Sequence, residues 1–192
     1  MEGCNIPIYS ELIENNKILQ LLGDDYKHIL IIGCGGCVNE SLALKNKIPI
    51  IVLDEITRQP IPYSVTNEIK RLAKLLHKHG FDVIWKVVPE NNLLCMRNVN
   101  EDIPVTINET TIDAILAICC PAGICGLRKI VSNSIHIFQI TKQIGFLYYV
   151  FDEYENEKKI KYEDSKVIIY QGNVYEKLNV DKEKGGTENE GC

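Results

Sequence analysis

The sequence predicts an α/β protein, with a Rossmann-like, doubly wound and mostly parallel sheet followed by a C-terminal β-hairpin. Short apolar runs bounded by Gly or Pro recur along the chain, as is typical of strands that are buried on both faces. Segments with the 3.6-residue spacing of helices separate these runs. After Gly145 the pattern changes to aromatic and β-branched runs, which favours antiparallel strands.

The first elements are predicted as a helix, a strand and a second helix. Ser10 is suited to cap a helix, with Glu11 in its first turn, and Gly23 ends the run. The apolar residues of this helix would be Leu12, Ile13, Leu19 and Leu22. Residues 28–32 are then predicted as a buried strand, and residues 37–46 as a short helix after a glycine turn.

The middle of the chain predicts two more strands around a long helix. Residues 49–53 form a second buried strand, and residues 57–62 form a loop around two prolines. A helix starts at Ser64 and ends at Gly80, with one apolar stripe. Residues 81–88 form a third strand, which ends at Pro89. The apolar stripe of the helix consists of Val65, Ile69, Leu72, Leu75 and Leu76.

The last third predicts one more strand and helix and then the hairpin. Residues 111–118 form a strand, and a helix begins near Ile124. Residues 146–151 and 166–170 form the two strands of the hairpin, with a long loop rich in Glu and Lys between them. The chain is therefore expected to divide into an α/β domain (1–145), a hairpin appendage (146–180) and a disordered tail (181–192).

Composition excludes several classes of function. The chain has 192 residues and a net charge of −5, and it has no basic patch of the kind that binds nucleic acid beyond the short helix face from Lys70 to Lys78, which we expect to be a solvated surface. Its N-terminus lacks the features of a signal peptide, and no apolar run is long enough to span a bilayer. We therefore expect a cytoplasmic protein, in which eight cysteines serve as ligands or reactive thiols rather than as a disulfide framework.

Four cysteines lie where the predicted strands end. Cys34 and Cys37 follow the first strand, Cys95 follows the third, and Cys120 follows the fourth. The carboxyl ends of parallel strands share one edge of a sheet, so these thiolates are expected to converge on one metal centre. Nearby glycines would form the wall of the pocket and direct N–H groups at sulfur. They are Gly33, Gly35, Gly36 and Gly123.

The identity of the bound group is left open by these residues. A [4Fe–4S] cluster fits cysteines on separate strand ends better than zinc does, because zinc ribbons more often use two Cys-x-x-Cys knuckles. Cys125 is a possible spare ligand, whereas Cys119 reads as a small buried residue. Two alternatives without metal are a thiol redox protein using Cys34 and Cys37, and a small-molecule or corrinoid-type binding module.

Three motifs resemble the amino-terminal domain of MetV-type proteins, which are accessory subunits of methylenetetrahydrofolate reductases and are also described as methylenetetrahydrofolate reductase C-terminal-like. The motifs are the glycine-cysteine turn at 31–37, the Pro89 loop with Cys95, and the segment 117–124 around Cys120. The resemblance covers roughly residues 8–140. It implies a role in electron transfer in one-carbon metabolism, with Cys34, Cys37, Cys95 and Cys120 as ligands.

The resemblance also bears on partners and on catalysis. It implies a methylenetetrahydrofolate reductase catalytic subunit, or another redox protein, as partner, and no contact with nucleic acid or membrane. The family's flavin- and folate-binding barrel belongs to the reductase, so this chain is not expected to be catalytic alone. Ser41 stands where the family typically has another cysteine, and Cys125 stands where it often has Gln.

Overall fold

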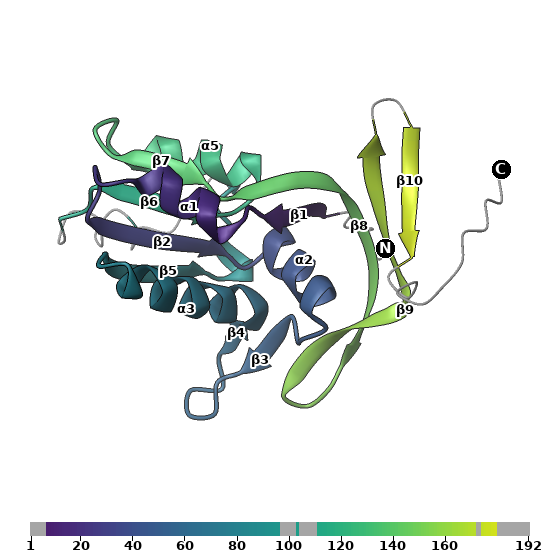
Figure 1. Cartoon of the computed structure of the whole chain (residues 1–192). Coiled ribbons are helices and arrows are strands. Elements are labelled where there is room, and N and C mark those ends of the chain that lie inside the picture. The colour runs from purple at the N-terminus through teal and green to yellow at the C-terminus, as the bar shows by residue number, and fades with distance from the viewer. Residues whose placement is uncertain (1–6, 97–102, 104–110, 172–173, 180–192) are drawn as a thin grey trace.

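The protein has a mixed α/β fold with one parallel and one antiparallel sheet (Figure 1). This computed structural model describes residues 7–96, 103, 111–171 and 174–179, with backbone alone from residue 171 onward. The predicted tail (181–192), Cys4 and Cys192 lie outside the described residues.

The parallel sheet contains three of the four strands that the buried apolar runs predicted, those at 28–32, 81–88 and 111–118. Its order is β5-β2-β6-β7, and each neighbouring pair is parallel. The strands are β2 (His28–Cys34), β5 (Asp82–Val88), β6 (Ala114–Ile118) and β7 (His136–Gln139). Every residue of β6 is buried, as a strand covered on both faces must be.

Helices cover both faces of this sheet, as Figure 1 shows. Alternation along β2 directs Ile29 and Ile31 to one face, and Leu30 and Ile32 to the other. The first face packs against α1 (Asn15–Leu22) and α3 (Tyr63–Lys78), and the second against α5 (Pro121–Ile130). None of the helices in the described ranges is both long and apolar enough to cross a membrane.

The antiparallel sheet gathers strands from both ends of the chain. Its order is β1-β8-β9-β3-β4, and β10 pairs with β9. The bounds are β1 (Ile8–Leu12), β3 (Ile51–Leu53), β4 (Pro60–Pro62), β8 (Thr141–Glu153), β9 (Glu157–Gln171) and β10 (Val174–Asn179).

The prediction of a helix capped by Ser10 is wrong in its first half. Residues 8–12 form β1, which pairs antiparallel with β8, and the helix begins only at Asn15. The Ser10 N–H donates to Ser41 Oγ at 3.1 Å instead of entering a helix. The predicted end is confirmed, since Gly23 caps α1 with φ of 51°. Pairing with a strand more than 100 residues away overrode the local capping signal.

The predicted parallel strand at 49–53 and the loop at 57–62 are also corrected. Residues 51–53 form β3 in the antiparallel sheet, where Ile51 pairs with Lys158 and with Pro62. Residues 60–62 form β4, an edge strand. An edge position tolerates proline because the missing N–H would face away from the sheet.

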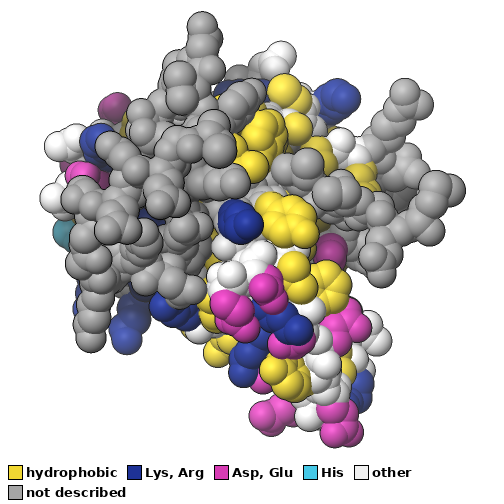
Figure 2. Space-filling view, turned by 90° about the vertical axis from the view of Figure 1, so that its right-hand side faces the viewer, with side chains coloured by type: hydrophobic (Ala, Val, Ile, Leu, Met, Phe, Trp, Pro, Cys, Tyr) yellow, Lys and Arg dark blue, Asp and Glu magenta, His cyan; other side chains and the backbone are white. Residues whose placement is uncertain are grey.

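The predicted hairpin exists, but the long loop between its strands is wrong. The polar stretch continues both strands, and Tyr154 N–H donates to the Glu157 carbonyl to close the turn. Opposite charges meet across the strands and favour this pairing, as in the Lys161–Asp152 ion pair at 2.9 Å. Figure 2 looks onto this side of the molecule, where hydrophobic side chains lie among charges of both signs.

Helix α2 (Cys37–Asn46), which was predicted, lies between the two sheets (Figure 1). Val38 and Leu42 pack with the parallel sheet, whereas Ala43 and Leu44 pack with β8 and β9. Seven consecutive residues, 38–44, are buried. A helix that is buried on all sides needs no polar face, which explains its lack of amphipathic pattern.

Candidate metal centre

The candidate site lies at the carboxyl edge of the parallel sheet. Cys34 is the last residue of β2 and pairs with Val88, the last residue of β5. Cys120 follows β6, whose last residue, Ile118, pairs with Gly33. From β2 the chain proceeds to β5 on one side and then to β6 on the other, so the strand order reverses here. Ligands of open α/β sheets bind at such points.

Two helices begin at this edge, and each begins with a cysteine. Cys37 is the first residue of α2, and Cys120 caps the first turn of α5. The Cys37 thiol donates a hydrogen bond to the Cys120 sulfur, which ties the two helix N-termini together. The structure therefore joins two cysteines that are 83 positions apart in the sequence.

The environment of Cys120 favours its thiolate. The Cys37 S–H and the backbone N–H groups of Ala122 and Gly123 donate to its sulfur and lower the pKa of Cys120 to about 6. The pKa of Cys37 is raised, because that thiol holds the shared proton and is largely buried. A thiolate at a helix N-terminus is a metal ligand and also a nucleophile.

Cys34 lies on the other side of the edge and is buried. Backbone N–H groups of Gly36 and Leu94 donate to its sulfur and lower its pKa, but burial outweighs them and raises the pKa overall. The sulfurs of Cys120 and Cys95 are close enough to raise it further by charge repulsion. Cys34 is therefore a thiol whose surroundings would accept a thiolate once a cation compensated its charge.

Cys95 reaches the same edge from a loop. This loop follows β5 through a short 3-10 turn, η1 (Glu90–Asn92), and it packs against α5. A Cβ built on Gly126 would overlap the Leu94 carbonyl, so the backbones of α5 and the loop are in close contact. Cys95 itself is exposed. The structure thus brings all four predicted ligands to one edge of the sheet.

The four sulfurs do not form a closed ligand shell. Within the described residues, no group of three or more His, Cys, Asp or Glu side chains is arranged to hold a single metal ion. Zinc requires four donors around one point, whereas each thiolate of a [4Fe–4S] cluster binds a different iron atom. The donors at this edge are four thiols, with several backbone N–H groups directed at sulfur.

The predicted glycines are explained by close packing. A Cβ on Gly33 would overlap the Ile69 side chain, and one on Gly35 would lie 2.7 Å from Val88 O. Gly36 and Gly123 have similar neighbours, Leu93 and Cys119. The sequence predicted that all four glycines would direct N–H groups at sulfur. Of the four, Gly36 and Gly123 do so.

The three other residues considered as ligands have different surroundings. Cys119 is fully buried in the core beneath α5, and burial raises its pKa. Cys125 is exposed on α5. Ser41 Oγ donates to the Cys37 carbonyl at 2.7 Å and accepts from the Ser10 N–H, so it joins α2 to β1.

Sequence reasoning missed a buried carboxyl beside these cysteines. Glu40 lies one turn after Cys37 on α2, and the Tyr149 hydroxyl donates to its Oε1 at 2.6 Å. Its other oxygen, Oε2, is buried and has no hydrogen-bond partner among the described residues. Burial raises the pKa of Glu40 and that of Tyr149. The one available signal was a carboxylate three residues after a cysteine in a helix.

Comparison of the chain with protein-family models, with curated proteins and with solved structures finds no match.

Proposed function

We propose that this chain binds a [4Fe–4S] cluster through Cys34, Cys37, Cys95 and Cys120, and that it acts as an electron-transfer accessory subunit in the cytoplasm. One observation carries the proposal: backbone N–H groups are directed at the sulfurs of three of these cysteines, at one edge of the parallel sheet. Such donors stabilise thiolate charge and tune the potential of a cluster.

The four cysteines are carried by different elements of the fold. The end of β2 and the starts of α2 and α5 carry Cys34, Cys37 and Cys120, and the loop after β5 would supply Cys95 as the fourth ligand. When bound, the cluster would carry single electrons. The strand order supports a Rossmann-like, doubly wound sheet, in which the reversal of order provides a ligand crevice.

The resemblance to MetV-type proteins supports the choice of partner. A methylenetetrahydrofolate reductase catalytic subunit, or another redox protein, would exchange electrons with the cluster. This chain would then supply the electron-carrying group and the docking surface, and the partner would supply the reaction.

The test is metal analysis of protein purified without oxygen. We expect stoichiometric iron and sulfide, broad visible absorption that bleaches with dithionite, and an electron paramagnetic resonance signal in the reduced state. Cys34→Ser and Cys95→Ser should each lose most of the iron, whereas Cys125→Ser, an exposed position on α5, should retain it. Stoichiometric zinc would contradict the cluster, and a folded, metal-free protein with all its cysteines dispensable would favour the small-molecule module.

A second candidate is a dithiol that exchanges with disulfides, favoured by the hydrogen bond between Cys37 and Cys120. The Cys120 thiolate would attack oxidised glutathione and displace one glutathione thiolate. Cys37 would then lose its proton, attack Cys120 sulfur in the mixed disulfide and release the second glutathione. This candidate uses Cys37 and Cys120, whose side chains interact, whereas the sequence motif suggested Cys34 and Cys37.

This candidate is tested by titrating the thiolate through its ultraviolet absorption in metal-free protein. Absorption should rise as the pH rises through about 6, because Cys120 deprotonates there, and Cys120→Ser should abolish this step. Cys37→Ala should move the midpoint upward, whereas Cys37→Ser, which keeps a hydrogen-bond donor, should move it less. No step below the ordinary cysteine range, about 8.5, would count against the dithiol.

A further inference from the structure

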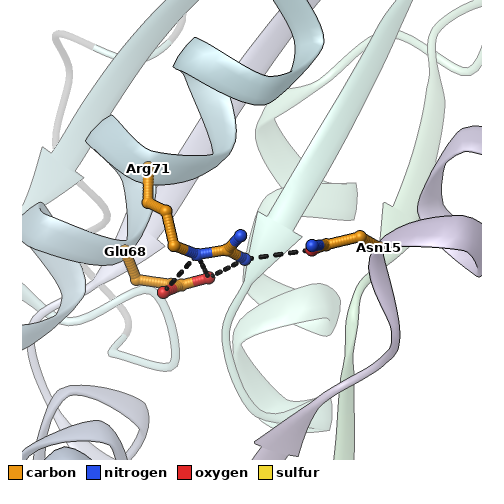
Figure 3. Close-up of polar contacts among 3 residues, drawn as sticks. All are labelled: Asn15, Glu68 and Arg71. Carbon is orange, nitrogen blue, oxygen red and sulfur yellow. Dashed lines mark hydrogen bonds and ion pairs between the residues drawn. The ribbon is translucent and has the colours of Figure 1, made fainter.

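Helix α3 carries one arginine and three lysines, and the arginine is bound within the molecule. Arg71 Nε donates to the Glu68 carboxylate at 2.9 Å, and Arg71 Nη2 donates to Asn15 at 3.0 Å (Figure 3). The Arg71 charge is therefore compensated, and it fastens α3 to the start of α1.

The three lysines of α3 lack such an ion pair among the residues that the structure describes. Lys70, Lys74 and Lys78 follow one another at intervals of four residues, so they form a row along the helix. All three are exposed, and none forms an ion pair with a described residue. His77 lies beside this row, with its Nδ1 3.1 Å from the Phe81 carbonyl.

The row borders an open groove whose floor includes the single tryptophan of the chain. Trp85 is 44% exposed, although tryptophan is mostly buried in folded proteins. The groove has a volume of about 500 Å³. Among the described residues its lining is Lys70, Ala73, Lys74, His77, Lys78 and Trp85, none of which is acidic.

Trp85 belongs to an edge strand. Strand β5 is the first strand of the order β5-β2-β6-β7, so within the described part of the chain it pairs only with β2. An exposed edge strand presents unpaired backbone groups along one side. The groove thus combines an exposed aromatic ring with a row of cations.

We propose that this groove docks an acidic protein surface, with an apolar side chain of the partner packed on Trp85 and its carboxylates facing the lysine row. The chain has a net charge of −5, so the groove is a local concentration of positive charge that would attract an acidic surface of a partner protein. Tryptophan surrounded by charge is typical of the residues that dominate protein–protein binding.

A protein surface suits the groove better than a small anion does. Every charged side chain that lines it is exposed, so no buried polar group would fix a small ligand in one orientation. Exposed lysines contribute through long-range steering and through several weak ion pairs, which a broad acidic surface provides. None of the four candidate ligand cysteines lines the groove, so binding of an acidic surface there does not depend on the cluster.

The test uses Trp85 fluorescence, which reports on the groove alone because the chain has no other tryptophan. The probe is a synthetic peptide rich in Glu and Asp with one central Leu. We expect saturable binding with a blue shift of Trp85 emission, weakened by salt. A matched peptide with Gln and Asn in place of the acids should bind at least roughly fivefold more weakly, because it loses the ion pairs.

Matched variants locate the binding. Lys74→Glu should weaken the acidic peptide by roughly fivefold, whereas Lys129→Glu, an exposed reversal on α5 across the sheet, should change it little. Equal weakening by both variants would reduce the effect to net charge and overturn the proposal. Binding of ATP that is stronger than binding of the peptide would overturn it too, by assigning the groove to a nucleotide.

Discussion

At the scale of single residues, the environment of Glu40 differs most from its ordinary surroundings. A carboxylate loses solvation when it is buried, and here one hydrogen bond from Tyr149 compensates only one of its oxygens. Lys158 and Glu90 act on the same carboxyl with opposite signs, Lys158 lowering its pKa and Glu90 raising it. Burial is the largest effect, so the folded protein favours the protonated form of Glu40.

This predicts a pH-dependent stability that Glu40→Gln should remove. Because the folded state binds the proton more tightly, stability is greatest below the ordinary carboxyl pKa, about 4.3, and is lost as the pH rises through the raised pKa. Urea unfolding between pH 4 and pH 8 should show the variant losing less stability than the wild type. Glu163→Gln, at an exposed position of β9, is the control, and a parallel course of wild type and Glu40→Gln would refute the prediction.

At the scale of elements, one glycine allows helix α5 and the loop that carries Cys95 to pack closely together. Gly126 lies inside α5, where glycine ordinarily costs about 1 kcal/mol relative to alanine. Its absence of a side chain lets the Leu94 carbonyl approach the helix backbone. The loop that carries Cys95 is positioned by this contact and not by hydrogen bonds within the loop alone.

Gly126→Ala is therefore expected to destabilise the protein, the reverse of its effect in an exposed helix. The added methyl group must displace the Leu94 backbone, at a cost of about 1–3 kcal/mol. Cys125→Ala, the neighbouring exposed position, should change the free energy of unfolding by less than about 0.5 kcal/mol. Chemical denaturation measures both, and a Gly126→Ala protein that is more stable than wild type would show that the loop does not pack there.

At the scale of the whole molecule, α2 couples the two sheets. Its residues belong to the core of the parallel sheet on one side and to the core beneath the hairpin on the other. Its buried polar residues add cross-links: Asn39 donates to the Ile50 carbonyl at 2.8 Å and accepts from the Val65 N–H at 2.9 Å. The cysteine at its start therefore depends on both sheets for its position.

Leu147→Ala should show this coupling. Leu147 is fully buried on β8, and its truncation should cost about 2–5 kcal/mol. If the sheets unfold together, the urea midpoint reported by Trp85, in the parallel sheet, should fall as much as that reported by circular dichroism. Tyr148→Ala, at an exposed neighbouring position, should cost less than about 1 kcal/mol. An unchanged Trp85 transition would mean that the hairpin is a separate unit.

Much of the parallel sheet and the place of the cysteines could be predicted from the sequence. The runs at 28–32, 81–88 and 111–118 carry their own signal, because strands buried on both faces are apolar throughout. Cysteines that follow such strands must lie at one edge of the sheet. Residues 49–53 form the same kind of apolar run, yet residues 51–53 belong to the antiparallel sheet. An apolar run predicts a buried strand but does not specify which strand it pairs with.

The sequence by itself determined which segments form the buried strands of the parallel sheet, and it predicted that Cys34, Cys37, Cys95 and Cys120 follow the ends of such strands. Only the tertiary structure decided that residues 8–12 are a strand, that Cys37 contacts Cys120, and that Tyr149 meets Glu40. The physical reason is range: burial and periodicity act within a few residues of sequence. Strand pairing and side-chain hydrogen bonds join residues whose separation, 109 positions for Glu40 and Tyr149, leaves no local trace.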